Sequence, residues 1–314
     1  MFKNFWYALE FSKVVDGKRS VEMPCLGQDV VMHRDPSGRV RAWNKARTGK
    51  AEFPATDRYG FVWVFLGDPD LPASEMPPIP DWPEWDDPAY GGHAATGEFF
   101  WNAGAERILE NGVDIAHAPF VHAGQFGNPN RPEVPEHTVI ETEYSAETTV
   151  TLYPPGSKGM WGKFKNRNVN LDDRPGVTTN TCWMMPNIIR LKVNIPIGVL
   201  CLYDTNIPVA KNQTLTKFVV LRTFLTGTWA DKNAVKRTMP IFVNDAAVVE
   251  HQRPELLPYD LSAELHIRSD QMALAYRRRR QGLLDGGWGY DWKTPLPGMD
   301  PSRLPEVDAR SLAA

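Results

Sequence analysis

The feature that most constrains the fold is a series of five strand-like runs between residues 138 and 226. The runs cover residues 138–152, 178–185, 188–195, 199–204 and 215–226. Apolar side chains recur along them in the manner of strands that bury one face. Helix-like segments flank the series at 105–120, at 232–249, where Pro240 is expected to interrupt the helix, and at 265–281. Helices at both ends of antiparallel-looking strands predict an α+β fold.

The residues before this series divide into two parts. Residues 1–68 contain short strand-like runs, of which 59–66 is the strongest, and a hairpin turn at 35–38. Residues 69–92 contain seven prolines, a composition typical of an extended linker wrapped on the surface rather than of a packed element. We therefore expect a small all-β unit at 1–68, a proline-rich linker at 69–93 and a larger domain at 94–314.

Composition excludes several classes of protein. The 35 basic and 38 acidic residues give a net charge of −3, which provides no overall field for nucleic acid. The single basic run, Arg277 to Arg280, indicates either a solvated helix face or a site for an acidic partner. No apolar stretch approaches the roughly 18 residues of a membrane helix, and the first residues do not form a signal-peptide core. We expect a globular, cytoplasmic protein that binds neither nucleic acid nor membrane.

The segment 110–122, with the sequence ENGVDIAHAPFVH, carries the candidate chemistry. Asp114 and His117 are three residues apart and would share one face of a helix. His117 and His122 are five apart, so they converge only if the helix ends or bulges between them, which Pro119 would explain. The best downstream carboxylate is Asp245. Two imidazoles and one carboxylate, with other positions open, suit a non-haem Fe(II) that binds O₂ beside a substrate.

Plainer explanations of the same residues remain open. The two histidines could be unrelated, and Asp245 could be an ordinary exposed acid of a helix. Two histidines and a carboxylate also suit zinc, as in a hydrolase.

The pattern Asn111-x-x-Asp114-x-x-His117-x4-His122, followed by Asp245 ahead of the sequence VVEHQRP, resembles the catalytic domain of Rieske-type non-haem iron oxygenase α subunits. This is the ring-hydroxylating and demethylating family. The resemblance implies a mononuclear Fe(II) held by His117, His122 and Asp245. It implies that Asp114 orients a ligand histidine and relays an electron from a cluster, and Asn111 of the same motif is taken with it as catalytic. It also implies a helix-grip fold, in which a curved antiparallel sheet holds a pocket beneath a long C-terminal helix.

The sequence departs from this family where the Rieske cluster should be. A [2Fe–2S] Rieske cluster needs two cysteines and two histidines, and the resemblance places them between Trp43 and Phe53, where residues 45–52 contain neither. The chain has three cysteines, which are Cys25, Cys182 and Cys201. They lie outside this segment, and we expect them to be core residues. We therefore interpret residues 1–68 as a reduced Rieske-like remnant without cluster ligands, in a chain that carries no [2Fe–2S] cluster.

Two main functional hypotheses follow. The first is an oxygenase subunit that hydroxylates or oxidatively demethylates a small apolar or aromatic molecule with O₂. Its electrons would come from a Rieske- or ferredoxin-type donor and a reductase, within a homo- or hetero-oligomer based on a trimer. The second is a non-catalytic ligand-binding or scaffold subunit, and a zinc hydrolase is third. The complete residue set favours the oxygenase, because ligand binding alone requires none of these side chains.

Overall fold

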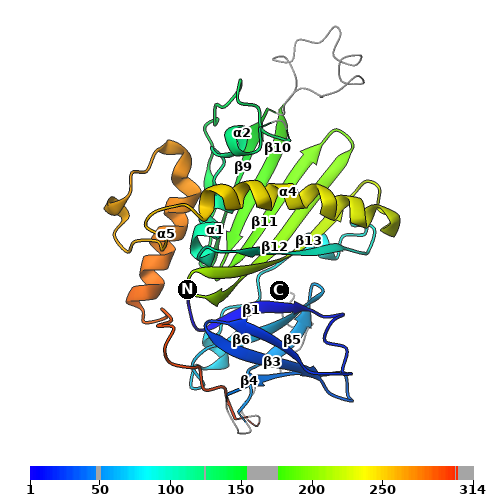
Figure 1. Ribbon diagram of the computed structural model, residues 1–314, viewed down its shortest axis with the longest axis vertical. Helices are drawn as coiled ribbons and strands as arrows, with labels where there is room; N and C mark the ends of the chain where they lie inside the picture. Colours follow the sequence, from blue (N-terminus) through cyan, green and yellow to red (C-terminus); the bar gives the residue numbers. More distant parts are fainter. Residues whose placement is uncertain (47–50, 124, 154–175, 301, 303–314) are drawn as a thin grey trace.

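The computed structural model describes residues 1–46, 51–123, 125–153, 176–300 and 302. Residues 47–50, inside the segment where cluster ligands were sought, lie outside this described part. The chain forms a large antiparallel sheet, a smaller all-β unit before it and helices on and beside the large sheet (Figure 1). The predicted α+β class is confirmed.

The large sheet has seven strands in the order β7-β13-β12-β11-β10-β9-β8. The strands are β7 Ala95–Trp101, β8 Val139–Glu141, β9 Ser145–Leu152, β10 Val177–Met184, β11 Ile188–Ile195, β12 Gly198–Ala210 and β13 Gln213–Arg222. The predicted run 138–152 is therefore a hairpin of two strands, and the run 199–204 is part of a longer strand. Side chains alternate between the faces of the sheet, so Leu202 belongs to the core beneath helix α4 and Tyr203 belongs to the core on the other face.

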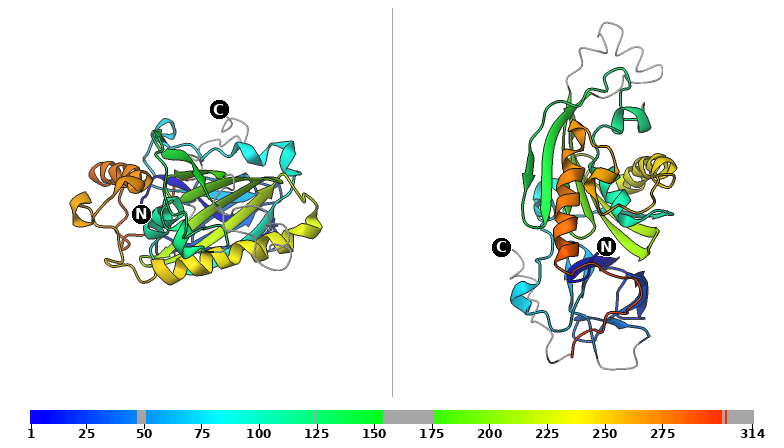
Figure 2. Two further views of the ribbon diagram at one scale, coloured as in Figure 1. Left: turned by 90° about the horizontal axis from the view of Figure 1, so that it is seen from above. Right: turned by 90° about the vertical axis from the view of Figure 1, so that its left-hand side faces the viewer.

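The α-helices are α1 Ala105–Val113, α2 Ala118–Val121, α4 Asp231–Val249 and α5 Gln271–Asp285. Helix α4 crosses one face of the sheet, and α5 lies beside the sheet and packs on α1 (Figures 1 and 2). Pro240 lies inside α4 without interrupting it, contrary to the prediction. The predicted last helix begins at Gln271 instead of at residue 265. Short 3-10 helices cover Ala73–Glu75, Pro83–Trp85, Pro88–Tyr90, Thr228–Ala230, Leu261–Ala263 and Arg268–Asp270.

The N-terminal unit contains two three-stranded antiparallel sheets, β1-β6-β5 and β2-β3-β4. Their strands are β1 Phe5–Phe11, β2 Val21–Cys25, β3 Gln28–Arg34, β4 Val40–Asn44, β5 Ala55–Arg58 and β6 Phe61–Leu66. Every residue of β1 and β6 is buried. These strands are largely apolar on both faces because one face packs within the unit and the other against the large domain.

The face of the large sheet opposite α4 is covered by the linker and the N-terminal unit. Trp82 of the linker is fully buried and stacks on Tyr203, with ring centroids 4.1 Å apart. Lys217 of β13 is 2% exposed, pairs with Glu10 of β1 at 2.8 Å and also contacts Glu98. The linker is thus packed into the core, and a buried ion pair joins the two units.

The basic run lies on α5, and its four arginines form ion pairs within the chain. Arg277 pairs with Glu110 and Glu264, and Arg280 pairs with Glu106. The other two arginines contact glutamates near β8. The run therefore joins α5 to α1 and to the sheet edge, which neither interpretation of it predicted. No helix in the described residues combines the length and apolarity needed to cross a membrane.

Candidate metal centre

The two candidate histidines lie at the ends of one short helix. Helix α1 ends at Val113, and Asp114 takes an extended backbone conformation in which its Oδ1 accepts a hydrogen bond from the Ala116 amide at 2.8 Å. This local turn ends the helix. Helix α2 then begins after His117 and ends before His122. A helix thus ends between the two histidines, as their spacing requires. Pro119 does not cause that end, because proline is favoured in the first turn of a helix and here it lies at the start of α2.

Asp245 reaches the same place from α4. It is 6% exposed, and Phe242, one helical turn earlier, packs against Phe218 of the sheet with ring centroids 5.0 Å apart. Asn244 Nδ2 also donates a hydrogen bond to the Val121 carbonyl of α2 at 3.4 Å. The aromatic contact fixes the rotation of α4, and with it the side on which Asp245 projects.

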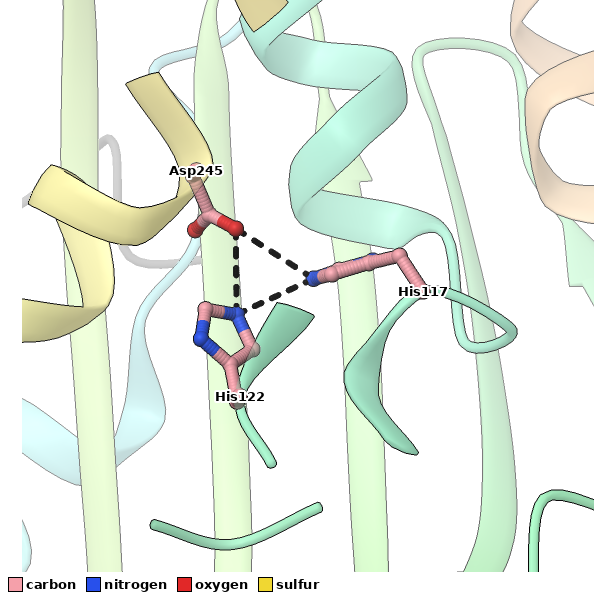
Figure 3. A group of neighbouring side chains, drawn as sticks. All are labelled: His117, His122 and Asp245. Carbon is pink, nitrogen blue, oxygen red and sulfur yellow. Dashed lines mark hydrogen bonds and ion pairs between the residues drawn. The ribbon is translucent and has the colours of Figure 1, made fainter. Parts of the chain in front are cut away.

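The three side chains converge (Figure 3). The Nε2 atoms of His117 and His122 are 3.1 Å apart. Asp245 Oδ1 lies 3.0 Å from His122 Nε2 and 3.5 Å from His117 Nε2. Two of the side chains are almost enclosed, because only 1% of the His122 side chain and 9% of the Asp245 side chain are exposed.

This arrangement fits a divalent metal ion. The circle through the three atoms has a radius of about 1.9 Å, and typical bonds from nitrogen or oxygen to such ions are about 2.0 to 2.2 Å long. The three atoms are therefore close enough together to hold one divalent ion, to which His117 and His122 would offer nitrogen and Asp245 oxygen. Asp245 Oδ1 is buried and accepts no hydrogen bond of normal geometry, as expected of an oxygen placed for a cation.

Asp114 lies on the far side of the His117 ring. Its Oδ2 is 3.5 Å from His117 Nδ1, an ion-pair distance that is too long for a hydrogen bond of normal strength. Burial lowers the pKa of His117, but Asp114 and Asp245 outweigh burial and raise the pKa overall. Asn111 and Asp114 both line a cavity of about 380 Å³. Asn111 is not one of the three converging residues, and its catalytic role stays a prediction.

The loop after α2, which the sequence indicates at residues 125–129, supports His122. The ring of Phe126 packs on the His122 ring with centroids 4.4 Å apart. The Gly127 amide donates to the His122 carbonyl at 3.1 Å, and a Cβ atom at Gly127 would lie only 1.9 Å from the Ala118 carbonyl oxygen. Phe126 and Gly127 form no recognisable sequence motif. Only the close approach of Gly127 to α2 explains why this residue is a glycine.

A buried series of hydrogen bonds on the α4-facing side of the sheet escaped prediction. Trp101 Nε1 donates to Thr216 Oγ1 at 2.7 Å, and Thr216 donates to Asn206 Oδ1 at 2.6 Å. Asn206 Nδ2 then donates to Asp204 Oδ1 at 2.7 Å. These residues come from β7, β13 and β12, so only the strand register brings them together.

Comparison with known proteins identifies the family. Residues 101–286 match the vanillate O-demethylase oxygenase C-terminal domain. Over 290 residues the chain is 24% identical to a vanillate O-demethylase oxygenase subunit of a Pseudomonas species, covering 86% of this chain and 83% of that protein. It is 25% identical over 237 residues to methylxanthine N1-demethylase NdmA of Pseudomonas putida, covering 75% and 61%.

Solved structures agree on the fold. NdmA of Pseudomonas putida CBB5 superposes with a TM-score of 0.68 at 17% identity, covering 92% of this chain and 93% of that chain. Dicamba monooxygenase bound to dicamba superposes with a TM-score of 0.64 at 15% identity, covering 90% and 97%. The family match spans more than half of the chain and contains all the candidate metal ligands. The chain therefore belongs to the vanillate O-demethylase oxygenase family, and it is an oxidoreductase subunit of the Rieske-type non-haem iron oxygenases.

Proposed function

We propose that this chain binds one iron(II) through His117, His122 and Asp245 and oxidatively demethylates or hydroxylates a small aromatic molecule with O₂. The observation that carries the proposal is the convergence of these three side chains within the family domain. Iron at such a site supplies the activation of O₂, which amino-acid side chains alone do not perform. The same ligands suit zinc, but membership in an oxygenase family favours iron.

The residues around the triad suit this task. Asp114 sits behind His117, where its charge favours one orientation of the ring and supports a role as the positioning carboxylate. The layer between α4 and the sheet is aromatic and aliphatic, with Phe99, Phe218, Phe242 and Leu202 among its members. Such side chains suit an aromatic substrate, and the relatives are named for vanillate and methylxanthines.

We propose that a separate cluster-bearing protein delivers the electrons, as the second partner of the reaction besides the substrate. The sequence has no Cys-x-His and Cys-x-x-His pairs with which to hold a Rieske cluster. Asp114 has 35% of its side chain exposed and lines the cavity that Asn111 also lines. The donor would approach from this side. A trimer-based assembly stays a prediction from the family resemblance.

Metal analysis tests the proposal and separates it from the scaffold alternative, which does not require the triad. Wild type purified with Fe(II) under anaerobic conditions should contain about one iron per chain. His122→Ala should contain almost none, and His251→Ala, which changes an exposed histidine, should match wild type. Product should form from a methoxyarene only when a cluster-bearing donor and its reductase are present. An iron-free wild type, or turnover with a reductase that lacks a Rieske cluster, would contradict the proposal.

A further inference from the structure

Asp204 is a buried carboxylate on the same side of the sheet as the metal ligands. It is 3% exposed and lies on β12, where it pairs with Ile189 of β11 and Phe218 of β13. Directly paired residues project to the same face, and Phe218 packs on Phe242 of α4. The negative charge of Asp245, one turn after Phe242, is near enough to raise the pKa of Asp204. Asp204 therefore lies in the layer between the sheet and α4 that also contains the triad.

The hydrogen bonds around Asp204 all run toward it. Trp101 donates to Thr216, Thr216 to Asn206, and Asn206 to Asp204 Oδ1, so Asp204 is the final acceptor of the series. Its other oxygen, Oδ2, accepts no hydrogen bond from the described residues. The series thus fixes the direction of the carboxylate and leaves one oxygen available.

The neighbours of Asp204 leave that oxygen in an apolar setting. A Cβ atom at Gly97 of β7 would lie 2.3 Å from the Phe218 ring, so this ring lies over β7, on the side of β13 away from Asp204. Ile189 leans toward α1, because a Cβ at Gly112 would lie 2.3 Å from its Cδ1. No described lysine or arginine forms an ion pair with Asp204.

We propose that Asp204 contacts the substrate and selects aromatic molecules that present a hydrogen-bond donor, a phenolic O–H or a ring N–H, at this position. This inference rests on the proposed function and specifies its substrate class. Oδ2 accepts the donor, while the apolar neighbours contact the ring. A methyl group at the same position would leave Oδ2 without a partner, and a carboxylate would place a second negative charge beside a buried acid. A site built to hydrogen-bond a substrate group rejects analogues that lack that group.

Calorimetric binding of two matched probes to the iron-loaded protein, without O₂, tests the proposal. The probes are 2-methoxyphenol and 1,2-dimethoxybenzene, which differ only in the replacement of O–H by O–CH₃. At pH 8, where Asp204 is ionised, wild type should bind the phenol at least about 10-fold more tightly, as expected for a hydrogen bond to a buried charged acceptor. In Asp204→Leu the preference should fall below about threefold. Asp204→Asn, which keeps the side-chain volume and the acceptor for Asn206, should weaken the preference and covers the case in which the leucine variant does not fold.

A control variant separates this role from a general effect on the strand. Thr205→Val removes buried hydrogen bonds to Ala8 and Asn187 on the opposite face of β12, and it should keep the wild-type preference. Equal affinity of wild type for the two probes, an unchanged preference in both Asp204 variants, or no binding of either probe at millimolar concentration would overturn the proposal. Iron content measured on the same samples identifies which inference fails. Normal iron with no preference overturns only the role of Asp204, whereas an iron-free wild type overturns the proposed function itself.

Discussion

Replacing Asp204 by asparagine should alter how the stability of the protein depends on pH. Burial raises the pKa of Asp204 from 3.8 to about 7, with the hydrogen bond from Asn206 opposing the change and the charge of Asp245 adding to it. A pKa difference of this size between the folded and unfolded chain corresponds to about 4 kcal/mol of folding free energy. This is a large fraction of the roughly 5 to 15 kcal/mol that stabilises a typical domain.

The sign follows from which state holds the proton. Between pH 4 and 7 the folded chain keeps Asp204 protonated, whereas the unfolded chain has released this proton. Wild type therefore loses stability as the pH rises through this range, and about 2 to 3 kcal/mol of the loss falls between pH 5 and pH 8. Asparagine does not titrate and still offers an oxygen to Asn206, so the variant lacks this component of the pH dependence.

Urea unfolding followed by circular dichroism at several pH values from 5 to 8 measures this effect. A chelator keeps the protein metal-free, so that the charge of Asp245 is not neutralised by a cation. The free energy of unfolding of Asp204→Asn relative to wild type should increase by about 2 to 3 kcal/mol from pH 5 to pH 8. Thr205→Val should differ from wild type by a constant amount at every pH. Parallel curves for Asp204→Asn and wild type would refute the reasoning, because they would mean that Asp204 titrates normally.

Three further predictions concern the metal centre. Fe(II) at about 100 times its Kd should stabilise wild type by about 2.7 kcal/mol, and His122→Ala should abolish the corresponding rise in Tm under anaerobic conditions. Asp114→Asn should keep its fold and its iron but lose about 10- to 100-fold in donor-dependent product formation, and wild-type turnover in this variant would exclude a positioning role. Gly127→Ala should lower the iron content, because its Cβ would displace the Ala118 carbonyl of α2, and full iron loading would show that the loop does not position His122.

The sequence predicted most strands of the large sheet, because runs of apolar and β-branched residues favour strands, but β7 at Ala95–Trp101 was not predicted. The run 188–195 coincides with β11. Predictions that required a choice between local roles of one residue fared worse. The interpretation of Pro119 as a helix breaker is wrong, because proline also starts helices. The turn that does end α1 depends on a hydrogen bond from the Ala116 amide to the Asp114 side chain. Both errors concern backbone conformation over a few residues.

Interactions between distant segments could not be predicted from the sequence. The arginines of α5 were interpreted as solvated or as a partner site, yet Glu106, Glu110 and Glu264 neutralise two of them from elsewhere in the chain. The sequence does not distinguish Asp204 as a candidate site residue, because an acid within a strand-like run belongs to no motif. The metal ligands were an exception, since their spacing within one segment resembles a known family, and the structure brings these same three residues together.

The buried pair of Lys217 and Glu10 has a consequence for how this chain can be recombined with others. An exchange of residues 1–68 for another domain would have to supply a carboxylate at the place of Glu10, or leave an ammonium group that is 2% exposed without that counter-ion. Glu98 of β7, the other carboxylate that contacts this ammonium group, would remain, so the exchange would weaken the pairing of Lys217 without abolishing it. The outer face of the oxygenase sheet thus depends in part on the chemistry of its N-terminal neighbour.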